Sequence, residues 1–177
     1  MSFEEPTIAE ETIFTGRVVQ LKKLTVGLPN GKTSTREVII HPGAVAVLAE
    51  PEENHVLLVQ QYRKACERVL WEIPAGKLEA NEAPDDAAKR ELAEETGYAA
   101  ARLQKIHTFF TSPGFANEVL HVYYAADLEQ GELNLDEDEF VETTLVSREQ
   151  VESMLTSGEI ADAKTLVALL WWLGTKS

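Results

Sequence analysis

The stretch GKLEANEAPDDAAKRELAEETGY, residues 76–98, organises the whole sequence. It predicts a helix from Pro84 to Thr96. Proline suits the first turn, where its missing N–H is no loss, and the two aspartates after it place negative charge at the positive end of the helix dipole. Gly97 then ends the helix, because glycine takes the left-handed conformation most easily. The predicted helix buries a narrow apolar face made of Ala87, Ala88, Leu92 and, less strongly, Ala93.

Three carboxylates project from one region of that helix. Glu91, Glu94 and Glu95 lie within about one turn of each other. Packed like charges repel, and a helix that keeps them without a basic partner on each one usually has a cation to neutralise them. Carboxylate oxygens are hard ligands, so the cluster indicates Mg²⁺ or Mn²⁺ rather than a soft metal. The alternative is a solvated acidic helix in which Arg90 pairs with Asp86 and Glu94.

The same stretch resembles the Nudix hydrolase box. The fixed positions of the box are filled by Gly76, Glu82, Arg90, Glu91, Leu92, Glu94, Glu95 and Gly97. One position departs from the pattern: the box usually closes with an aliphatic residue, and this chain has Tyr98, which changes packing size at a position that is not a ligand. Both glycines, the first glutamate and the arginine stand at the right spacing, which favours the resemblance over the solvated helix.

The resemblance implies a metal site and a reaction. The substrates of this family have the form of a nucleoside diphosphate linked to a second group, and their phosphoanhydride is hydrolysed. By carry-over, Glu91 and Glu95 are the main metal ligands, Glu94 is an additional ligand or a base, and the Ala75 carbonyl is a backbone ligand. Arg90 is placed in the catalytic machinery with Glu94, and together with Glu82 it orients the carboxylates.

Segments outside the box resemble the ADP-ribose pyrophosphatase subfamily, most closely its bacterial members. Pro113 lies sixteen residues beyond Gly97, and the likeness extends from about Thr7 to Leu173. It implies substrate contacts from seven residues, namely Arg36, Glu37, Arg63, Glu72, Pro113, Phe115 and Glu118. For Arg63 the alternative is a surface salt bridge, and for Glu72 an exposed strand residue.

An acidic loop at residues 133–139 is the candidate source of the general base. The subfamily resemblance implies a mobile loop after the box helix that supplies a glutamate to activate the attacking water. Glu137 and Glu139 both occupy the matching region, and the sequence does not separate them. The alternative is a solvated acidic turn.

Composition limits the partners. A formal net charge of −14 disfavours duplex nucleic acid or an anionic membrane surface. The one cysteine, Cys66, excludes an intrachain disulfide and a cysteine-based zinc cluster, and we expect it to be a packed thiol. No leader or membrane-length apolar run is visible in the sequence, so the expectation is a cytoplasmic protein that acts on a small molecule.

The Nudix resemblance implies an α/β/α sandwich around a mixed sheet, with additional antiparallel strands at the N-terminus. Residues 1–43 should form a strand region that is exchanged in a homodimer, and residues 44–177 the Nudix domain. Runs at 44–49 and 55–60 predict core strands joined as a hairpin. Residues 1–11 are acidic and contain Pro6, so the first few of them should be frayed or become ordered only against a partner. A C-terminal helix at 161–173 should bury Leu166, Leu169, Leu170 and Leu173.

The function expected from this resemblance is Mg²⁺-dependent hydrolysis of ADP-ribose to AMP and ribose 5-phosphate. One alternative is a broader nucleoside diphosphate sugar hydrolase. The other is a module that senses ADP-ribose by binding it without cleavage, against which the intact glutamate set argues.

Overall fold

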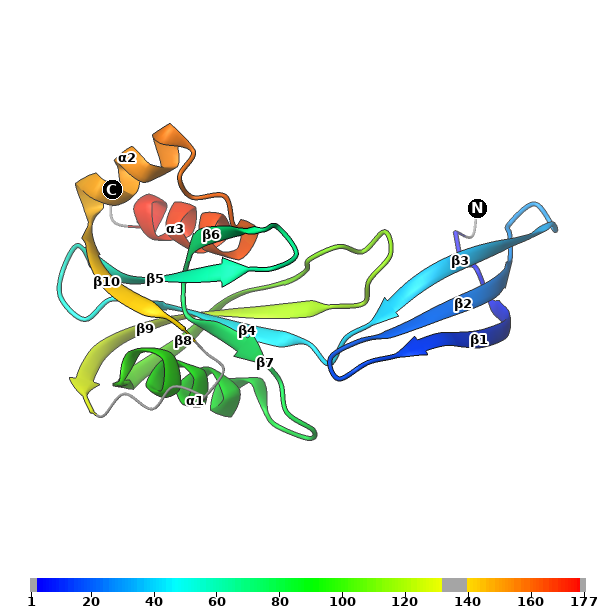
Figure 1. The fold of residues 1–177 in the computed structure, drawn as a ribbon, viewed down its shortest axis with the longest axis horizontal. Coiled ribbons are helices and arrows are strands. Elements are labelled where there is room, and N and C mark those ends of the chain that lie inside the picture. The colour runs from blue at the N-terminus through cyan, green and yellow to red at the C-terminus, as the bar shows by residue number, and fades with distance from the viewer. Residues whose placement is uncertain (1–2, 132–139, 176–177) are drawn as a thin grey trace. The chain divides into compact units, whose positions relative to one another are not determined.

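The structure is a computed structural model that describes residues 3–131 and 140–175 (Figure 1). Its helices are α1 (Pro84–Thr96), α2 (Arg148–Ser157) and α3 (Ala163–Thr175). Its strands are β1 (Thr7–Thr15), β2 (Gln20–Gly27), β3 (Thr33–Ile40), β4 (Ala44–Ala49), β5 (His55–Arg63), β6 (Arg68–Glu72), β7 (Ala75–Lys77), β8 (Tyr98–Phe110), β9 (Val119–Gln130) and β10 (Glu142–Ser147). None of the helices within these ranges is long and apolar enough to cross a membrane.

The chain divides into two compact units. The smaller unit comprises Met1–Gly43 and Phe110–Val119, and the larger comprises Ala44–Phe109 and the chain from Leu120 onward. In the smaller unit, β1, β2 and β3 form an antiparallel sheet in that order. The turn between β2 and β3 contains Gly31 at a φ of 81°, as the Asn-Gly pair predicts.

The acidic N-terminal stretch forms a strand from Thr7 onward. The backbone of β1 pairs with β2 from Thr7, opposite Val26, to Thr15, opposite Gln20. Every residue of β1 has an exposed side chain, so the strand has no burial pattern that the sequence could indicate. Backbone pairing, together with the ion pair between Lys22 and Glu10, orders this segment.

In the larger unit, β4 is the central strand of a mixed sheet. The sheet has the order β7-β4-β9-β8, with β4 antiparallel to β7 and parallel to β9. Alternate β4 side chains enter two different cores: Ala44, Ala46 and Leu48 enter one, and Val45, Val47 and Ala49 the other. This two-sided burial explains why the strand reads as an unbroken apolar run.

The hairpin predicted for β4 and β5 is wrong, although both strands exist. Strand β5 belongs to a different sheet, in which it lies between β10 and β6. The turn residues between the strands suit a hairpin, but they do not specify which strands pair. Because β4 is buried on both faces, it instead uses both edges for β7 and β9.

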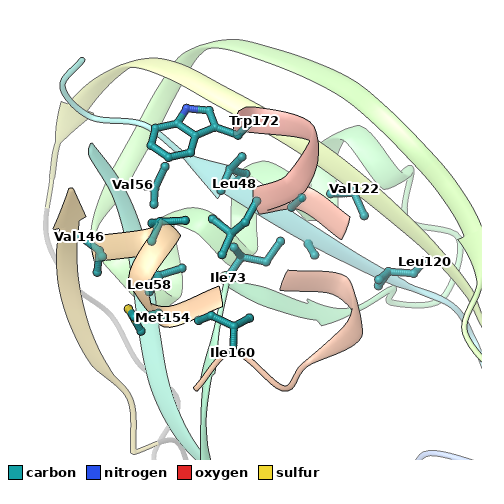
Figure 2. Close-up of a cluster of buried hydrophobic side chains, with 14 of the residues drawn as sticks. Leu48, Val56, Leu58, Ile73, Leu120, Val122, Val146, Met154, Ile160 and Trp172 are labelled. Atoms are coloured by element: carbon teal, nitrogen blue, oxygen red, sulfur yellow. The ribbon is translucent and has the colours of Figure 1, made fainter. Parts of the chain in front are cut away.

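Helices cover the mixed sheet of the larger unit on both sides, with α1 on one side and α2 and α3 on the other (Figure 1). Figure 2 shows the core next to α2 and α3, where Trp172 lies among Leu48, Val56 and other aliphatic side chains. The α/β/α sandwich implied by the resemblance is therefore confirmed, and the N-terminal antiparallel strands are confirmed with it.

The two C-terminal helices differ in how well the sequence predicted them. Helix α2 begins with a capping box between Ser147 and Gln150, which is a local signal in the sequence. In α3 the expected burial of Leu170 is wrong, because this side chain is exposed while Trp172 is fully buried. Tryptophan presents more apolar area than leucine, so the helix is rotated to bury it.

Candidate active site

Helix α1 has the predicted bounds, and its C-cap Gly97 adopts a φ of 72°. Ala87, Ala88 and Leu92 are fully buried, as predicted, and they pack on the α1 side of the mixed sheet. Two of the acidic residues are also buried. Glu91 is 8% exposed and Glu95 is 2% exposed, so these carboxylates are not part of a solvated face. Buried carboxylates require charged or hydrogen-bonding partners.

The chain just before α1 contacts both buried carboxylates. The backbone N–H of Ala75 donates to Glu95 Oε2 at 2.9 Å. A Cβ atom at Gly76 would lie 1.9 Å from the Glu91 carboxyl carbon, so only glycine fits there. Strand β7, which holds both residues, is fixed by its pairing with β4. The sheet therefore sets the distance between this segment and the helix.

Arg90 joins the carboxylates of the box. Its Nε and Nη2 donate to the two carboxylate oxygens of Glu82 at 2.8 and 2.9 Å. Its Nη1 donates to Glu91 at 2.8 Å and to Glu94 at 2.9 Å, and Nη2 also reaches the Lys77 carbonyl at 3.2 Å. The Arg90 hydrogen bond, helped by a backbone hydrogen bond from Glu79, lowers the pKa of Glu82 to about 2. The hydrogen bond with Glu82 in turn raises the pKa of Arg90 above its ordinary value.

The donor set fits a hard divalent metal. Within residues 3–131 and 140–175 no three His, Cys, Asp or Glu side chains already surround a common point, because Arg90 holds Glu91 and Glu94. Mg²⁺ does not need such a cage, since it is commonly bound through one or two carboxylates together with water and substrate phosphates. Glu91 and Glu95, beside a segment that lacks a side chain at Gly76, provide carboxylates of this kind.

Arg63 and Glu72 are brought together by the β5–β6 pair. Arg63 donates from Nε and Nη2 to the two oxygens of Glu72, both at 2.7 Å. Glu72 is only 1% exposed, so the alternative of an exposed strand residue is wrong. Burial alone would raise the pKa of Glu72, but the hydrogen bond from Arg63 and the charge of Lys164 hold it below the ordinary value.

Sequence reasoning missed three residues of this group, all at the start of α3. Lys164 donates to Glu72 and, at 3.0 Å, to Asp162. Asp162 accepts from the backbone N–H of Thr165 at 3.0 Å and from its Oγ1 at 2.6 Å. An Asp three residues before a Thr is a recognisable helix cap, but no local spacing indicates that this cap lies against Glu72.

Other residues implied as substrate contacts lie in the smaller unit. Glu118 accepts from Thr111 Oγ1 at 2.5 Å, and its Oε1 lies 3.4 Å from His41 Nδ1. Pro113 and Phe115 occupy a turn closed by a hydrogen bond from the Phe115 N–H to the Ser112 carbonyl at 3.1 Å, and Phe115 is exposed.

The two N-terminal candidates lie on β3. Arg36 donates from Nε and Nη2 to the Glu5 carboxylate at 2.9 and 2.5 Å. Glu37 stands opposite Lys23 in the β2–β3 register. Both belong to the smaller unit, whereas the box and Arg63 belong to the larger.

The two candidate bases, Glu137 and Glu139, lie outside the described residues. The described residues on either side of them bond to the end of α1. The Gly131 N–H donates to the Gly97 carbonyl at 2.6 Å, and Thr143 Oγ1 donates to the Glu95 carbonyl at 3.2 Å. The described residues Gly131 and Thr143 are therefore both bonded to the C-terminal end of the box helix.

The packed thiol expected at Cys66 is wrong. Cys66 is exposed in the turn between β5 and β6, where its N–H donates to the Arg63 carbonyl at 3.0 Å. Residues 64–69 around it are all exposed, so the turn offers the thiol no core to pack against.

Comparisons with known proteins agree with this arrangement. Residues 40–169 match the NUDIX domain. The chain is 52% identical over 170 residues to the ADP-ribose pyrophosphatase of Bacillus subtilis (strain 168), which covers 95% of this chain and 92% of that protein. It is 48% identical over 169 residues to the methanol dehydrogenase activator of Bacillus methanolicus, covering 94% of this chain and 91% of that protein.

A solved structure described as an ADP compounds hydrolase has the same fold. It superposes with a TM-score of 0.87, covers 100% of this chain and 98% of its own, and is 22% identical in sequence. This likeness supports the fold alone. Together with the domain match and the 52% identical relative, it confirms the resemblance seen in the box and its flanking segments, and the chain belongs to the Nudix hydrolase family.

Proposed function

We propose that this enzyme hydrolyses the pyrophosphate of ADP-ribose to AMP and ribose 5-phosphate. One observation carries the chemistry: Glu91 and Glu95 are nearly buried carboxylates on one helix, beside the Ala75–Gly76 backbone. The substrate is supported by the 52% identical relative from Bacillus subtilis, which is named an ADP-ribose pyrophosphatase and matches almost the whole chain.

Enzymes of this group depend on a divalent metal ion, and we propose Mg²⁺, with Mn²⁺ as a substitute. Glu91, Glu95 and the Ala75 carbonyl would hold the ion, with Glu94 as an additional ligand. Such an ion, when bound, neutralises phosphate charge and lowers the pKa of an attacking water. Arg90 keeps the carboxylates in place, because it is always charged and donates hydrogen bonds to Glu82, Glu91 and Glu94.

The proton of the attacking water is assigned to Glu137 or Glu139, or to Glu94. The first two remain candidates because Gly131 and Thr143, on either side of the acidic segment, bond to the end of α1. Glu94 is partly exposed and already accepts a hydrogen bond from Arg90. A variant series that removes each carboxylate in turn would identify the base as the one whose removal abolishes the acidic limb of the pH–rate profile, where protonation of the base lowers the rate.

For substrate binding we propose Arg63, with Glu72 acting through it, in the larger unit, and Arg36, Glu37, Pro113, Phe115 and Glu118 in the smaller. The Nudix resemblance further supports a homodimer in which residues 1–43 are exchanged and Arg36 completes the pocket of the partner. The exposed apolar side chains of β1 support an interface there, because Ile8, Ile13 and Phe14 are all more than half exposed. The proposed location is the cytoplasm, where Cys66 would stay reduced.

A second candidate follows from the 48% identical relative named a methanol dehydrogenase activator. Under this candidate, the chain would raise the activity of an alcohol dehydrogenase. Adding the chain, with and without Glu95→Gln, to a purified methanol dehydrogenase would test it. Stimulation of the dehydrogenase rate by the wild-type chain would support this second function.

The proposed hydrolysis is tested by measuring AMP release from ADP-ribose with Mg²⁺, Mn²⁺ or EDTA. ADP-glucose, NADH and diadenosine polyphosphates are run beside it to separate this activity from a broader hydrolase. We expect ADP-ribose to have the highest kcat/KM and EDTA to abolish turnover. ADP-ribose that binds without releasing AMP would indicate a sensor module instead. Cleavage of another substrate alone would leave the Nudix chemistry in place and overturn the assigned substrate.

A further inference from the structure

The carboxylate of Glu72 accepts hydrogen bonds from two cations of different elements. Arg63, at the end of β5, occupies both carboxylate oxygens, and Lys164, in the first turn of α3, donates to Oε2. The Lys164 side chain is 13% exposed and that of Glu72 is 2% exposed. A pair this enclosed keeps its geometry better than an exposed ion pair, because water does not compete for its donors.

Lys164 also donates to a second carboxylate, at the start of its own helix. Asp162 accepts from Lys164 at 3.0 Å and caps α3 through Thr165. Thr165 Oγ1 accepts from the backbone N–H of Ile73 at 2.9 Å, and Thr165 is fully buried. The first turn of α3 is therefore attached to the chain at Glu72 and at Ile73, just before the segment that reaches Glu95.

Within this group only Arg63 presents a donor to a ligand. Its side chain is 42% exposed, and in the described part of the chain its Nη1 makes no hydrogen bond. The charge of Glu95 is among the causes that raise the pKa of Arg63, after the larger effects of Glu72, so this guanidinium lies within the field of the box carboxylates. Glu72, by contrast, is too enclosed for a substrate to reach.

We propose that Lys164 and Asp162 are positioning residues: they hold Glu72 so that Arg63 presents its Nη1 edge to the diphosphate of the substrate. Glu72 then acts through Arg63 and does not touch the substrate. The inference rests on the proposed function for the identity of the ligand, a nucleoside diphosphate sugar. A guanidinium fixed by two bonds loses less conformational freedom when it binds phosphate, which is the gain that Lys164 and Asp162 provide.

A purely structural role makes a different prediction. If Lys164 only fastens α3 to β6, its removal lowers the thermal midpoint and leaves the affinity of folded protein for ligand unchanged. If it positions Arg63, its removal weakens ligand binding, and the weakening disappears once Arg63 is also removed. A double-mutant cycle distinguishes the two roles.

The test uses isothermal titration with the α,β-methylene analogue of ADP-ribose in the presence of Mg²⁺, because this analogue binds without being cleaved. Lys164→Met should weaken binding by about tenfold, and Lys164→Arg should restore it to within about twofold of wild type. Lys105→Met is the matched control, since Lys105 also pairs with a carboxylate, Asp85, at 3.3 Å, and should leave binding unchanged. In the Arg63→Met background, Lys164→Met should change binding by less than about twofold.

Two results would overturn the inference. One is that Lys164→Met binds the analogue as tightly as the wild type. The other is that Lys164→Met weakens binding equally in the wild-type and Arg63→Met backgrounds. If Lys164→Met does not fold, Asp162→Asn carries the same test, because asparagine still caps α3 but no longer fixes Lys164 by charge. Its expected effect is about threefold weaker binding. Turnover of ADP-ribose by the wild type is measured in parallel. If the variants bind the analogue as predicted but the wild type does not cleave ADP-ribose, the proposed function is wrong and this inference stands. If the wild type cleaves ADP-ribose but the variants bind the analogue normally, this inference is wrong and the proposed function stands.

Discussion

Arg90 and Arg63 are both paired with carboxylates in the larger unit, but they differ in what remains for a ligand. Arg90 uses Nε, Nη1 and Nη2 on Glu82, Glu91 and Glu94, and it also bonds a carbonyl. Arg63 uses Nε and Nη2 on a single buried carboxylate. The first arginine holds carboxylates in place, whereas the second is held by one. We therefore propose that the same residue type supports the chemistry at one position and ligand binding at the other.

The largest expected effect comes from a substitution at Gly76, which should disturb the carboxylates around Arg90 and leave the Arg63 network intact. In Gly76→Ala, the new methyl group would displace the Glu91 carboxylate, which it would otherwise approach to 1.9 Å. We expect kcat for ADP-ribose to fall by about 100-fold, because the residues around a metal site control its affinity and activity. Binding of the uncleaved analogue should change far less. Gly174→Ala is the control, since nothing lies within 4 Å of its added carbon. Equal loss of kcat in both variants would contradict this separation.

Replacing each arginine by lysine sharpens the comparison. Lysine cannot form the paired bonds that Arg90 makes to Glu82, so Arg90→Lys should raise the Mg²⁺ concentration for half-maximal activity by about tenfold or more. Arg63→Lys should instead raise KM for ADP-ribose by roughly tenfold and leave the Mg²⁺ dependence in place. The measurement is a matrix of initial rates over both concentrations. If the Mg²⁺ concentration for half-maximal activity rises in both variants, the two networks are not separate.

The smallest expected effect is on acid stability. Arg90 lowers the pKa of Glu82 from 4.5 to about 2, so the charged form is favoured in the folded state. A lowered folded pKa stabilises the protein above about pH 4.5, and this stabilisation is lost as the pH falls toward 2. The free energy of unfolding of the wild type, measured in urea, should therefore fall more steeply from about pH 5 to about pH 3 than that of Glu82→Gln. Glu129→Gln, at an exposed site, should show the same pH dependence as the wild type. If the free energy of unfolding falls in parallel with pH for all three proteins, the Arg90–Glu82 pair does not have this effect.

The comparison also explains how much of the site could be predicted from the sequence. The carboxylates that Arg90 bonds lie no more than eight positions away, on α1 or the turn before it. The resemblance to the box therefore sufficed to predict that it orients these carboxylates, and four-residue spacing indicated its pair with Glu94. The network of Arg63 runs from Glu72 to Lys164, which are 92 positions apart. No periodicity joins β6 to the start of α3, so the alternatives for Arg63 and Glu72 stayed open until the chain was folded.

The fold shows the same limit. Strands β4 and β5 were predicted within a few residues, because apolar β-branched runs and turn residues are local signals. Their pairing was predicted wrongly, because β4 is buried on both faces and bonds β7 and β9 instead. Similarly, the position of α3 was predicted, but the choice between Leu170 and Trp172 for the core depends on the shape of the opposite layer.

The most direct test of the two roles compares the steady-state kinetics of Glu95→Gln and Arg63→Met on ADP-ribose with saturating Mg²⁺. Glu95→Gln removes a charge from the proposed metal ligands, so kcat should fall by about a hundredfold with KM within a few-fold of wild type. Arg63→Met should raise KM by about tenfold or more with kcat largely kept. A loss of kcat in both variants, or an increase in KM in both, would contradict the division of labour between the two networks.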